Sequence, residues 1–589
     1  MDGGEGRPST AESAEARPSA AEFLDRAEER LRKLAIESQR ADWVAATYIT
    51  EDTLALAARA SGRLMEATRE LARAGRRYRD DPVPEEWRRR LRLLTLSLPL
   101  AAPASEAETE ELNELVNGMQ ARYATARAPR PDDGRPADVE ALDRYLGAET
   151  DPERLRAAWT GWHDAARPLR PLFRRYVDLA NRGARELGFD DTGALWRSKY
   201  EMAPDDFAAE IERLWEALLP FYRELHAFVR SALGRAYGPE RVPPDGPIPA
   251  HLLGNMWAQD WEPLLPRLRP PGGRPADDLT AALRARGTTP RQMVEYGERF
   301  FTSLGFAPLP GSFWSRSMLE RPAGREVVCH ASAWDIDFAD DLRIKMCVTG
   351  DAEDFRVVHH ELGHIFYQRA YATQPFLYRD GAHDGFHEAI GDTISLSVTP
   401  EYLVRLGLAD RTPTPEEEVG ELLARALGSV AFLPFAYLVD RWRWKVFDGT
   451  VTPETYTSSW WAERRRYQGI APPVARDETA FDPGAKYHIA ANVPYVRYFL
   501  AAILKFQFHR ALAHRIGAEG PLHRVSIYGQ PEAGAALREL LALGARRPWP
   551  EALEAFSGER RTDPTALLEY FRPLRDFLRT ENRGQPVGW

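Results

Sequence analysis

Residues 359–364 read His359-His360-Glu361-Leu362-Gly363-His364, and residues 385–392 read Gly385-Phe386-His387-Glu388-Ala389-Ile390-Gly391-Asp392. On a helix, His360 and His364 are four residues apart and share one face, so both imidazoles can reach one metal ion. Glu361 lies beside that metal, where it can take a proton from a zinc-bound water. His359 is a rival ligand, but only His360 and His364 frame a glutamate in the H-E-x-x-H spacing.

The third ligand is expected on the next helix. Glu388 lies 24 residues after His364, and Asp392 is one turn beyond Glu388 on the same face. Glu388 can therefore bind the metal while Asp392 accepts the other ring N–H of a ligand histidine. The competing interpretation is that these carboxylates are solvated helix charges and the histidines are incidental. An H-E-x-x-H motif arises by chance in roughly one chain in fifty, and the downstream segment at this position favours the zinc site.

The composition suits a large folded protein. Of the 589 residues, 44% are hydrophobic and 11% aromatic, which is enough for a sizeable core. The net charge of −10 is spread over interspersed acids and bases, and no basic stripe indicates nucleic-acid binding. The sequence contains no run of 18 apolar residues, so no membrane association is predicted.

Residues 1–20 are rich in Gly, Ala, Ser, Pro and Glu and contain no apolar segment. We therefore predict a disordered tail there, rather than a secretory signal. This indicates a cytoplasmic protein; a secreted or periplasmic location would require a different start codon. The two cysteines, Cys329 and Cys347, lie outside any zinc-finger pattern, and in an intracellular enzyme such thiols are usually reduced.

Helical spacing of apolar residues dominates the chain. It is clear over several long segments: 21–80, 153–187, 204–236, and from 353 to the end. Strand patterns are few, and residues 326–334 and 342–348 are predicted to form a short antiparallel pair just before the zinc helix. The predicted fold class is therefore mainly α with a small sheet.

Taken together, these motifs resemble the angiotensin-converting enzyme family of zinc peptidyl-dipeptidases over roughly 21–589. The matching segments, besides the two zinc segments, are 246–259, 326–335, 481–488, 493–499 and the final Gly588-Trp589. The resemblance implies a single peptidase domain over 21–589: a helical ellipsoid divided into two subdomains by a deep substrate channel, with N-terminal helices as a lid. It also implies one catalytic unit without a stalk or membrane anchor.

The resemblance implies the same zinc site as the spacing does: ligands His360, His364 and Glu388, the base Glu361 and the orienting carboxylate Asp392. It adds His488 and Tyr498, which match the pair that stabilises the transition state in the family. This is chemically reasonable, because an N–H or O–H donor aimed at the oxyanion of a tetrahedral intermediate contributes roughly 3–4 kcal/mol.

The resemblance also implies residues that bind substrate. His330 and Ala331 match the stretch that lines the peptide, with Ala331 acting through its backbone like an added strand. Lys486 and Tyr495 match the binders of the C-terminal carboxylate, which a peptidyl-dipeptidase must recognise. The third binder in the family is a Gln, and counting without gaps puts Arg286 in its place. Arg286 could pair with the carboxylate, clash with Lys486, or be a solvated surface residue.

Members of the family are often activated by chloride at two buried sites. The residues that match the first site are Arg197, Trp460 and Arg464. At the second site Arg497 is present, but the matching tyrosine is Phe228. A phenylalanine has no O–H to donate to an anion, so we predict weakened chloride binding there and an altered chloride dependence.

Cys329 and Cys347 are 18 residues apart and match one family disulfide. A bridge closing that loop would stabilise the protein by about 3 kcal/mol. Without a signal peptide, the two thiols could instead stay reduced.

The predicted function is zinc-dependent release of dipeptides from the free C-terminus of oligopeptides. The alternatives are a related zinc oligopeptidase or carboxypeptidase, and a catalytically silent peptidase-like protein that only binds peptides. The predicted cofactors are Zn2+ and, as an activator, chloride. The predicted partners are oligopeptide substrates, with no nucleic acid and no membrane, and the protein is expected to be a monomer or a dimer.

Overall fold

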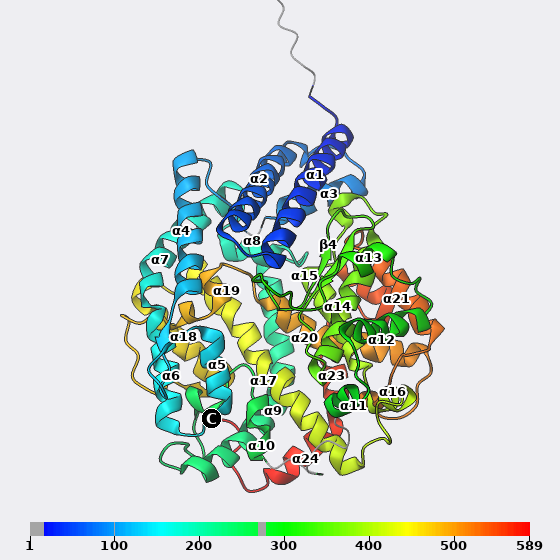
Figure 1. Ribbon diagram of the computed structural model, residues 1–589. Helices are drawn as coiled ribbons and strands as arrows, with labels where there is room; N and C mark the ends of the chain where they lie inside the picture. Colours follow the sequence, from blue (N-terminus) through cyan, green and yellow to red (C-terminus); the bar gives the residue numbers. More distant parts are fainter. Residues whose placement is uncertain (1–16, 99, 269–271, 273–278) are drawn as a thin grey trace, which may run out of the picture.

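The computed structural model describes residues 17–98, 100–268, 272 and 279–589, and it is mainly helical, as predicted (Figure 1). Residues 1–16 of the predicted tail lie outside the described residues.

The α-helices are α1 (Ala20–Thr47), α2 (Glu51–Gly75), α3 (Glu85–Leu96), α4 (Glu106–Thr125), α5 (Val139–Ala148), α6 (Pro152–Ala165), α7 (Arg170–Glu186), α8 (Thr192–Ser198), α9 (Pro204–Tyr237), α10 (Leu265–Leu268), α11 (Leu279–Ala285), α12 (Pro290–Ser303), α13 (Gly311–Arg316), α14 (Ala352–Tyr371), α15 (Asp384–Leu396), α16 (Pro400–Arg405), α17 (Pro415–Phe447), α18 (Tyr456–Glu463), α19 (Tyr487–Ala490), α20 (Val496–Arg515), α21 (Pro531–Leu543), α22 (Trp549–Ser557), α23 (Thr565–Tyr570) and α24 (Arg572–Glu581). The shorter 3-10 and π segments are η1 (Arg76–Tyr78), η2 (Arg167–Leu169), η3 (Ala250–Leu252), η4 (Glu262–Leu264), η5 (Phe376–Tyr378), η6 (Pro453–Thr455), η7 (Arg464–Gln468), η8 (Asp482–Ala485) and η9 (Leu522–Arg524). The strands are β1 (Ala128–Pro129), β2 (Pro136–Ala137), β3 (Ile248–Pro249), β4 (Ser332–Asp335), β5 (Leu342–Lys345) and β6 (Ile470–Ala471).

Helices α1 and α2 lie side by side at one end of the molecule, in blue in Figure 1. Ser19 and Glu22 form a capping box that starts α1 at Ala20, so helix begins at the last residue of the predicted tail. The two helices pack through small and aliphatic side chains such as Ala27, Leu31 and Ala67. These two helices occupy the segment in which the N-terminal lid was expected, and the lid itself stays a prediction.

Helices α14 and α15 carry the two motif segments, and glycines let them approach closely. A Cβ added at Gly363 would lie 2.7 Å from the Cα of Gly391, and one at Gly391 would lie 2.8 Å from Nδ1 of His360. Real Cβ atoms do not come this close, so the two backbones can meet at this distance only without side chains. The sequence Gly391-Asp392 thus brings the acidic helix directly against the histidines.

The predicted antiparallel pair is present but shorter than expected. Strand β4 pairs with β5 from Ser332↔Lys345 to Asp335↔Leu342. Residues 326–328 do not continue β4, because their backbone is bonded to the end of α1: Ile49 N–H donates to Glu326 O, and Val328 N–H donates to Ala46 O. The segment before Ala331 therefore connects the end of α1 to the strand pair that precedes α14.

The long helix α17 runs through the middle of the molecule (Figure 1), where it packs against α9 and α20. By length and composition it could cross a membrane, but 72% of its most apolar 18-residue window is buried inside the fold. A core helix of this kind meets the same criterion. In turn α20 packs on α15 and α15 on α14, so the central helices form a continuous support beneath the two motif segments.

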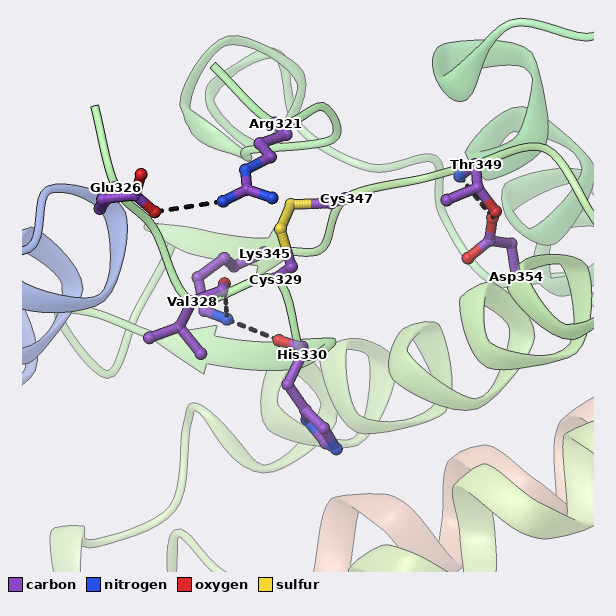
Figure 2. Close-up of a disulfide and its surroundings, with 9 residues drawn as sticks. All are labelled: Arg321, Glu326, Val328, Cys329, His330, Lys345, Cys347, Thr349 and Asp354. Atoms are coloured by element: carbon purple, nitrogen blue, oxygen red, sulfur yellow. Dashed lines mark hydrogen bonds and ion pairs between the residues drawn. A yellow bond between two sulfur atoms is a disulfide. The ribbon is translucent and has the colours of Figure 1, made fainter. Parts of the chain in front are cut away.

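The open question about the cysteines is answered by a disulfide between Cys329 and Cys347, with Cα atoms 5.0 Å apart. Figure 2 shows the bridge joining the segment before β4 to the residues just after β5. The ammonium of Lys345, the last residue of β5, donates to two carbonyls of the segment before β4, those of Val328 (2.7 Å) and His330 (2.5 Å). The bridge and this lysine hold the backbone that leads into Ala331.

Candidate metal centre

His360, His364 and Glu388 come together at one point, and their ligand atoms all lie within 4.8 Å of one another. Nε2 of His360 is 3.0 Å from Nε2 of His364 and 3.7 Å from a carboxylate oxygen of Glu388. Two imidazoles and one carboxylate from two adjacent helices are the donor set of a catalytic zinc site that keeps a position open for water or substrate. The residues therefore fit a zinc ion.

Asp392 lies behind this triad. Its carboxylate is 3.0 Å from Nδ1 of His360 and also 3.0 Å from the ammonium of Lys505. Burial alone would raise the pKa of Asp392, but Lys505 and His360 outweigh it and hold the pKa well below its usual range. Asp392 is therefore an anion that orients His360 so that Nε2 faces the metal position.

Glu361 lies in a cavity of about 460 Å³ next to His360. The same cavity is lined by His330, Ala331, Asp392 and the Cys329–Cys347 bridge, so the segment around Ala331 borders the same space as Glu361. Burial raises the pKa of Glu361, and the opposing effect of His360 does not reverse this. A carboxylate with a raised pKa beside a metal ligand and in contact with a cavity suits a general base.

His488 and Tyr498 form an aromatic cluster with Tyr495. The ring centroids of His488 and Tyr498 are 5.7 Å apart at right angles, and Tyr495 lies 4.6 Å from His488 and 5.0 Å from Tyr498. Burial lowers the pKa of His488 to about 2, with Lys486 and Arg443 adding to the effect. Burial also raises the pKa of Tyr498. Both groups are thus neutral and keep an N–H or O–H to donate.

Lys486 and Tyr495 converge on the side-chain oxygen of Gln259. The ammonium of Lys486 is 3.0 Å from this oxygen and the Tyr495 hydroxyl is 3.2 Å from it. Lys486 is only 6% exposed and lies 4.0 Å above the ring of Trp257. Among the described residues, no carboxylate lies within ion-pair distance of its ammonium. A buried cation with two neutral hydrogen-bonding partners is suited to binding an anion such as a carboxylate. We therefore call Gln259, Lys486 and Tyr495, which are the groups that would bind it, the carboxylate trio.

Comparison with known proteins decides the family. A family model described as angiotensin-converting enzyme matches residues 14–589. The angiotensin-converting enzyme of Theromyzon tessulatum is 39% identical over 559 residues, which cover 92% of this chain and 89% of that protein. The chain belongs to the angiotensin-converting enzyme family.

Mammalian members of the family are similar over a shorter stretch. Angiotensin-converting enzyme of Bos taurus is 46% identical over 489 residues, covering 82% of this chain and 37% of the bovine protein. The angiotensin-converting enzyme-like protein Ace3 of Mus musculus is 46% identical over 486 residues, covering 81% of this chain and 66% of that protein. The chain thus spans little more than a third of the length of the bovine enzyme.

Arg286 does not join the carboxylate trio, and its expected placement there is wrong. Its guanidinium donates to the backbone carbonyls of Leu406 and Gly407 and lies near the hydroxyl of Tyr296. The third member is Gln259, which ends one of the segments that resemble the angiotensin-converting enzyme family. Counting without gaps missed Gln259 because this residue, which follows η3 closely in sequence and precedes Arg286 by 27 positions, is the one whose side chain contacts Lys486. The matching segment itself was the signal that could have identified Gln259.

The residues predicted for the first chloride site of the family are only partly brought together. The guanidinium of Arg464 lies over the ring of Trp460 at 5.7 Å and donates to the carbonyl of Trp257. Burial lowers the pKa of Arg464 to about 9. Arg197 instead lies over Trp444 and 3.8 Å from Asp205.

The assignment of Phe228 to the second chloride site is wrong. Phe228 packs against Phe577, with ring centroids 5.8 Å apart. The tyrosines that interact electrostatically with Arg497 are Tyr498 and, more weakly, Tyr200, and the carboxylate of Asp384 interacts with Arg497 more strongly than either. Burial lowers the pKa of Arg497, but the combined effect of Asp384, Tyr498 and Tyr200 raises it by more, so the net shift is upward. The negative charge of Asp384 therefore already favours the charged form of Arg497.

Proposed function

We propose that this chain is a zinc-dependent peptidyl-dipeptidase that releases dipeptides from the free C-terminus of oligopeptides. Membership of the angiotensin-converting enzyme family supports a zinc peptidase. The observation that carries the finer assignment is the carboxylate trio, because it offers a buried cation and two neutral polar groups to one anion. A peptidase that cuts anywhere along a chain has no need of such a group.

The metal would be held by His360, His364 and Glu388, where a zinc ion supplies a Lewis acid that polarises a peptide carbonyl and acidifies water. Glu361 accepts the proton of the attacking water and passes it to the nitrogen of the leaving amine. Asp392 holds His360 in the orientation that presents Nε2 to the metal.

Charge develops on the carbonyl oxygen of the scissile bond during attack. Tyr498, which interacts electrostatically with Glu388, and its neighbour His488 are neutral donors that would stabilise this oxyanion, by roughly 3 kcal/mol for each well-aimed donor. The backbone near Ala331 borders the same cavity as Glu361 and can pair with an extended peptide. Lys486, Tyr495 and Gln259 would bind the carboxylate and so set the distance from the C-terminus to the cut.

Mass spectrometry of an unmodified decapeptide digested by the zinc-loaded protein tests this proposal. We expect successive losses of C-terminal dipeptides that a chelator stops. Removal of single residues would favour a carboxypeptidase, and internal cuts would favour an oligopeptidase. Zinc binding without any cleavage would favour a silent binding protein, but such proteins usually lack the base, and Glu361 is present.

The predictions of a monomer or dimer in the cytoplasm stay predictions. Light scattering checks the first and fractionation of cells checks the second. The disulfide near the site favours an oxidising compartment, since such bridges are rare in reducing cytosol. We also propose that chloride acts weakly at Arg497, because Asp384 already opposes its charge.

A further inference from the structure

His387, the residue before Glu388, contacts the second histidine ligand. Nδ1 of His387 lies 3.3 Å from Nδ1 of His364, and Nε2 of His387 lies 3.1 Å from the hydroxyl of Tyr371. The ring of His387 also stacks on Tyr367, with centroids 4.3 Å apart. His364, Tyr367 and Tyr371 lie on one face of α14, and α15 inserts His387 between them.

The direction of these hydrogen bonds follows from the metal site. Nε2 of His364 is 3.0 Å from Nε2 of His360, so this nitrogen faces the metal position and must be free of a proton to bind. The proton of a neutral His364 is then on Nδ1, which donates to Nδ1 of His387. A neutral His387 carries its own proton on Nε2 and donates it to the hydroxyl of Tyr371.

We propose that His387 and Tyr371 are positioning residues that hold His364 in the tautomer and ring orientation required for zinc. The proposal rests on the zinc site of the proposed function but not on peptide hydrolysis. The two histidine ligands are then supported in different ways. His360 donates to the anionic Asp392, whereas His364 donates to a neutral imidazole that is itself held by a phenol. Residues that orient a metal ligand typically change metal affinity 10- to 100-fold when they are replaced.

A second histidine–tyrosine pair, between His359 of α14 and Tyr402 of α16, provides a matched control. Nε2 of His359 lies 3.1 Å from the hydroxyl of Tyr402, the same separation as between His387 and Tyr371. Tyr402 is fully buried and Tyr371 is 5% exposed. The other nitrogen of His359, Nδ1, forms a hydrogen bond with the carbonyl of Phe355 rather than with a metal ligand. Removal of the Tyr402 hydroxyl therefore disturbs a similar buried pair without affecting His364.

The test measures zinc affinity by competition with a chromogenic chelator, in the wild type and in three variants. His387→Phe keeps a ring to stack on Tyr367 but removes the acceptor for His364, and we expect its zinc dissociation constant to rise about 10- to 100-fold. Tyr371→Phe removes one neutral hydrogen bond and should raise the constant about 2- to 10-fold. Tyr402→Phe should leave it unchanged. The cobalt-substituted protein adds a spectroscopic check, because the shifted N–H resonance of His364 should exchange faster in His387→Phe.

Two outcomes would overturn the proposal: zinc affinity of Tyr371→Phe equal to that of the wild type, or an equal loss in Tyr402→Phe. If His387→Phe does not fold, the comparison of the two tyrosine variants still decides. A wild type that binds no zinc would refute the proposed function itself. A wild type that binds zinc and cleaves dipeptides, with variants of equal affinity, would refute only the role of His387 and Tyr371.

Discussion

Lys486→Met should remove the demand for a free C-terminal carboxylate. The methionine keeps the length and burial of the side chain but carries no charge. In the carboxylate trio, Lys486 is the only cation, since Tyr495 and Gln259 are neutral. It is 6% exposed, so water cannot replace its interaction with a bound anion. Losing one charge-assisted hydrogen bond in such a place costs about 3 kcal/mol, which corresponds to roughly a 100-fold loss in binding.

The assay compares two N-blocked tripeptides that differ only in a free or an amidated C-terminus. For the free acid, kcat/KM should fall about 100-fold in Lys486→Met, whereas the value for the amide should stay within about threefold. Tyr495→Phe is the control, because it removes one neutral donor and should cost the acid only about 2- to 10-fold. An equal loss for acid and amide would show that Lys486 supports the fold, and an unchanged acid would show that it does not contact the carboxylate.

The same group predicts a pH dependence. Burial lowers the pKa of Lys486 to about 7, although Asp143 opposes this effect. Because an amine binds a carboxylate only when protonated, its binding is complete below this pKa and is lost as the pH rises through it. KM for the free acid should therefore increase roughly tenfold per unit above pH 7, and KM for the amide should not. A parallel rise for both peptides would assign the titration to another group.

Three further predictions concern the base, the disulfide and the anion. Glu361→Gln should lower kcat/KM by about 10²- to 10⁴-fold with zinc content unchanged; retained hydrolysis would rule out its role as the base. Alkylation of the freshly isolated protein should leave Cys329 and Cys347 unlabelled, and Cys329→Ser should lower the free energy of unfolding in denaturant by about 3 kcal/mol for a loop of 18 residues; two labelled thiols would contradict the bridge. Hydrolysis by the wild type should respond weakly to chloride, whereas Asp384→Asn should become dependent on it, because the strongest negative charge acting on Arg497 is then removed; steep activation of the wild type, abolished by Arg497→Gln, would refute this.

Helices were predictable wherever apolar residues repeat at helical spacing, and α1, α9 and α14 form where that spacing indicated. The pairing of β4 with β5 was also predictable, but its length was not. Residues 326–328 have the composition of a strand, yet they bond to the end of α1, which is far away in sequence. Such a choice between partners depends on which backbone lies nearby after folding.

The metal triad could be identified from sequence because its spacing is local. Two histidines four apart on one helix, with a glutamate beside them, share a face before any tertiary contact forms. The close approach of α14 and α15 then only had to bring Glu388 to them, and Gly363 and Gly391 permit it.

The carboxylate trio and the support of His364 depended on tertiary structure. Gln259 is 227 residues from Lys486, and no periodicity joins them, so an ungapped count chose Arg286 instead. His387 precedes a ligand by one residue, but its partners, His364 and Tyr371, are on another helix. Hydrogen bonds of this kind depend on the angle and separation of packed helices, which residue spacing within one segment does not specify.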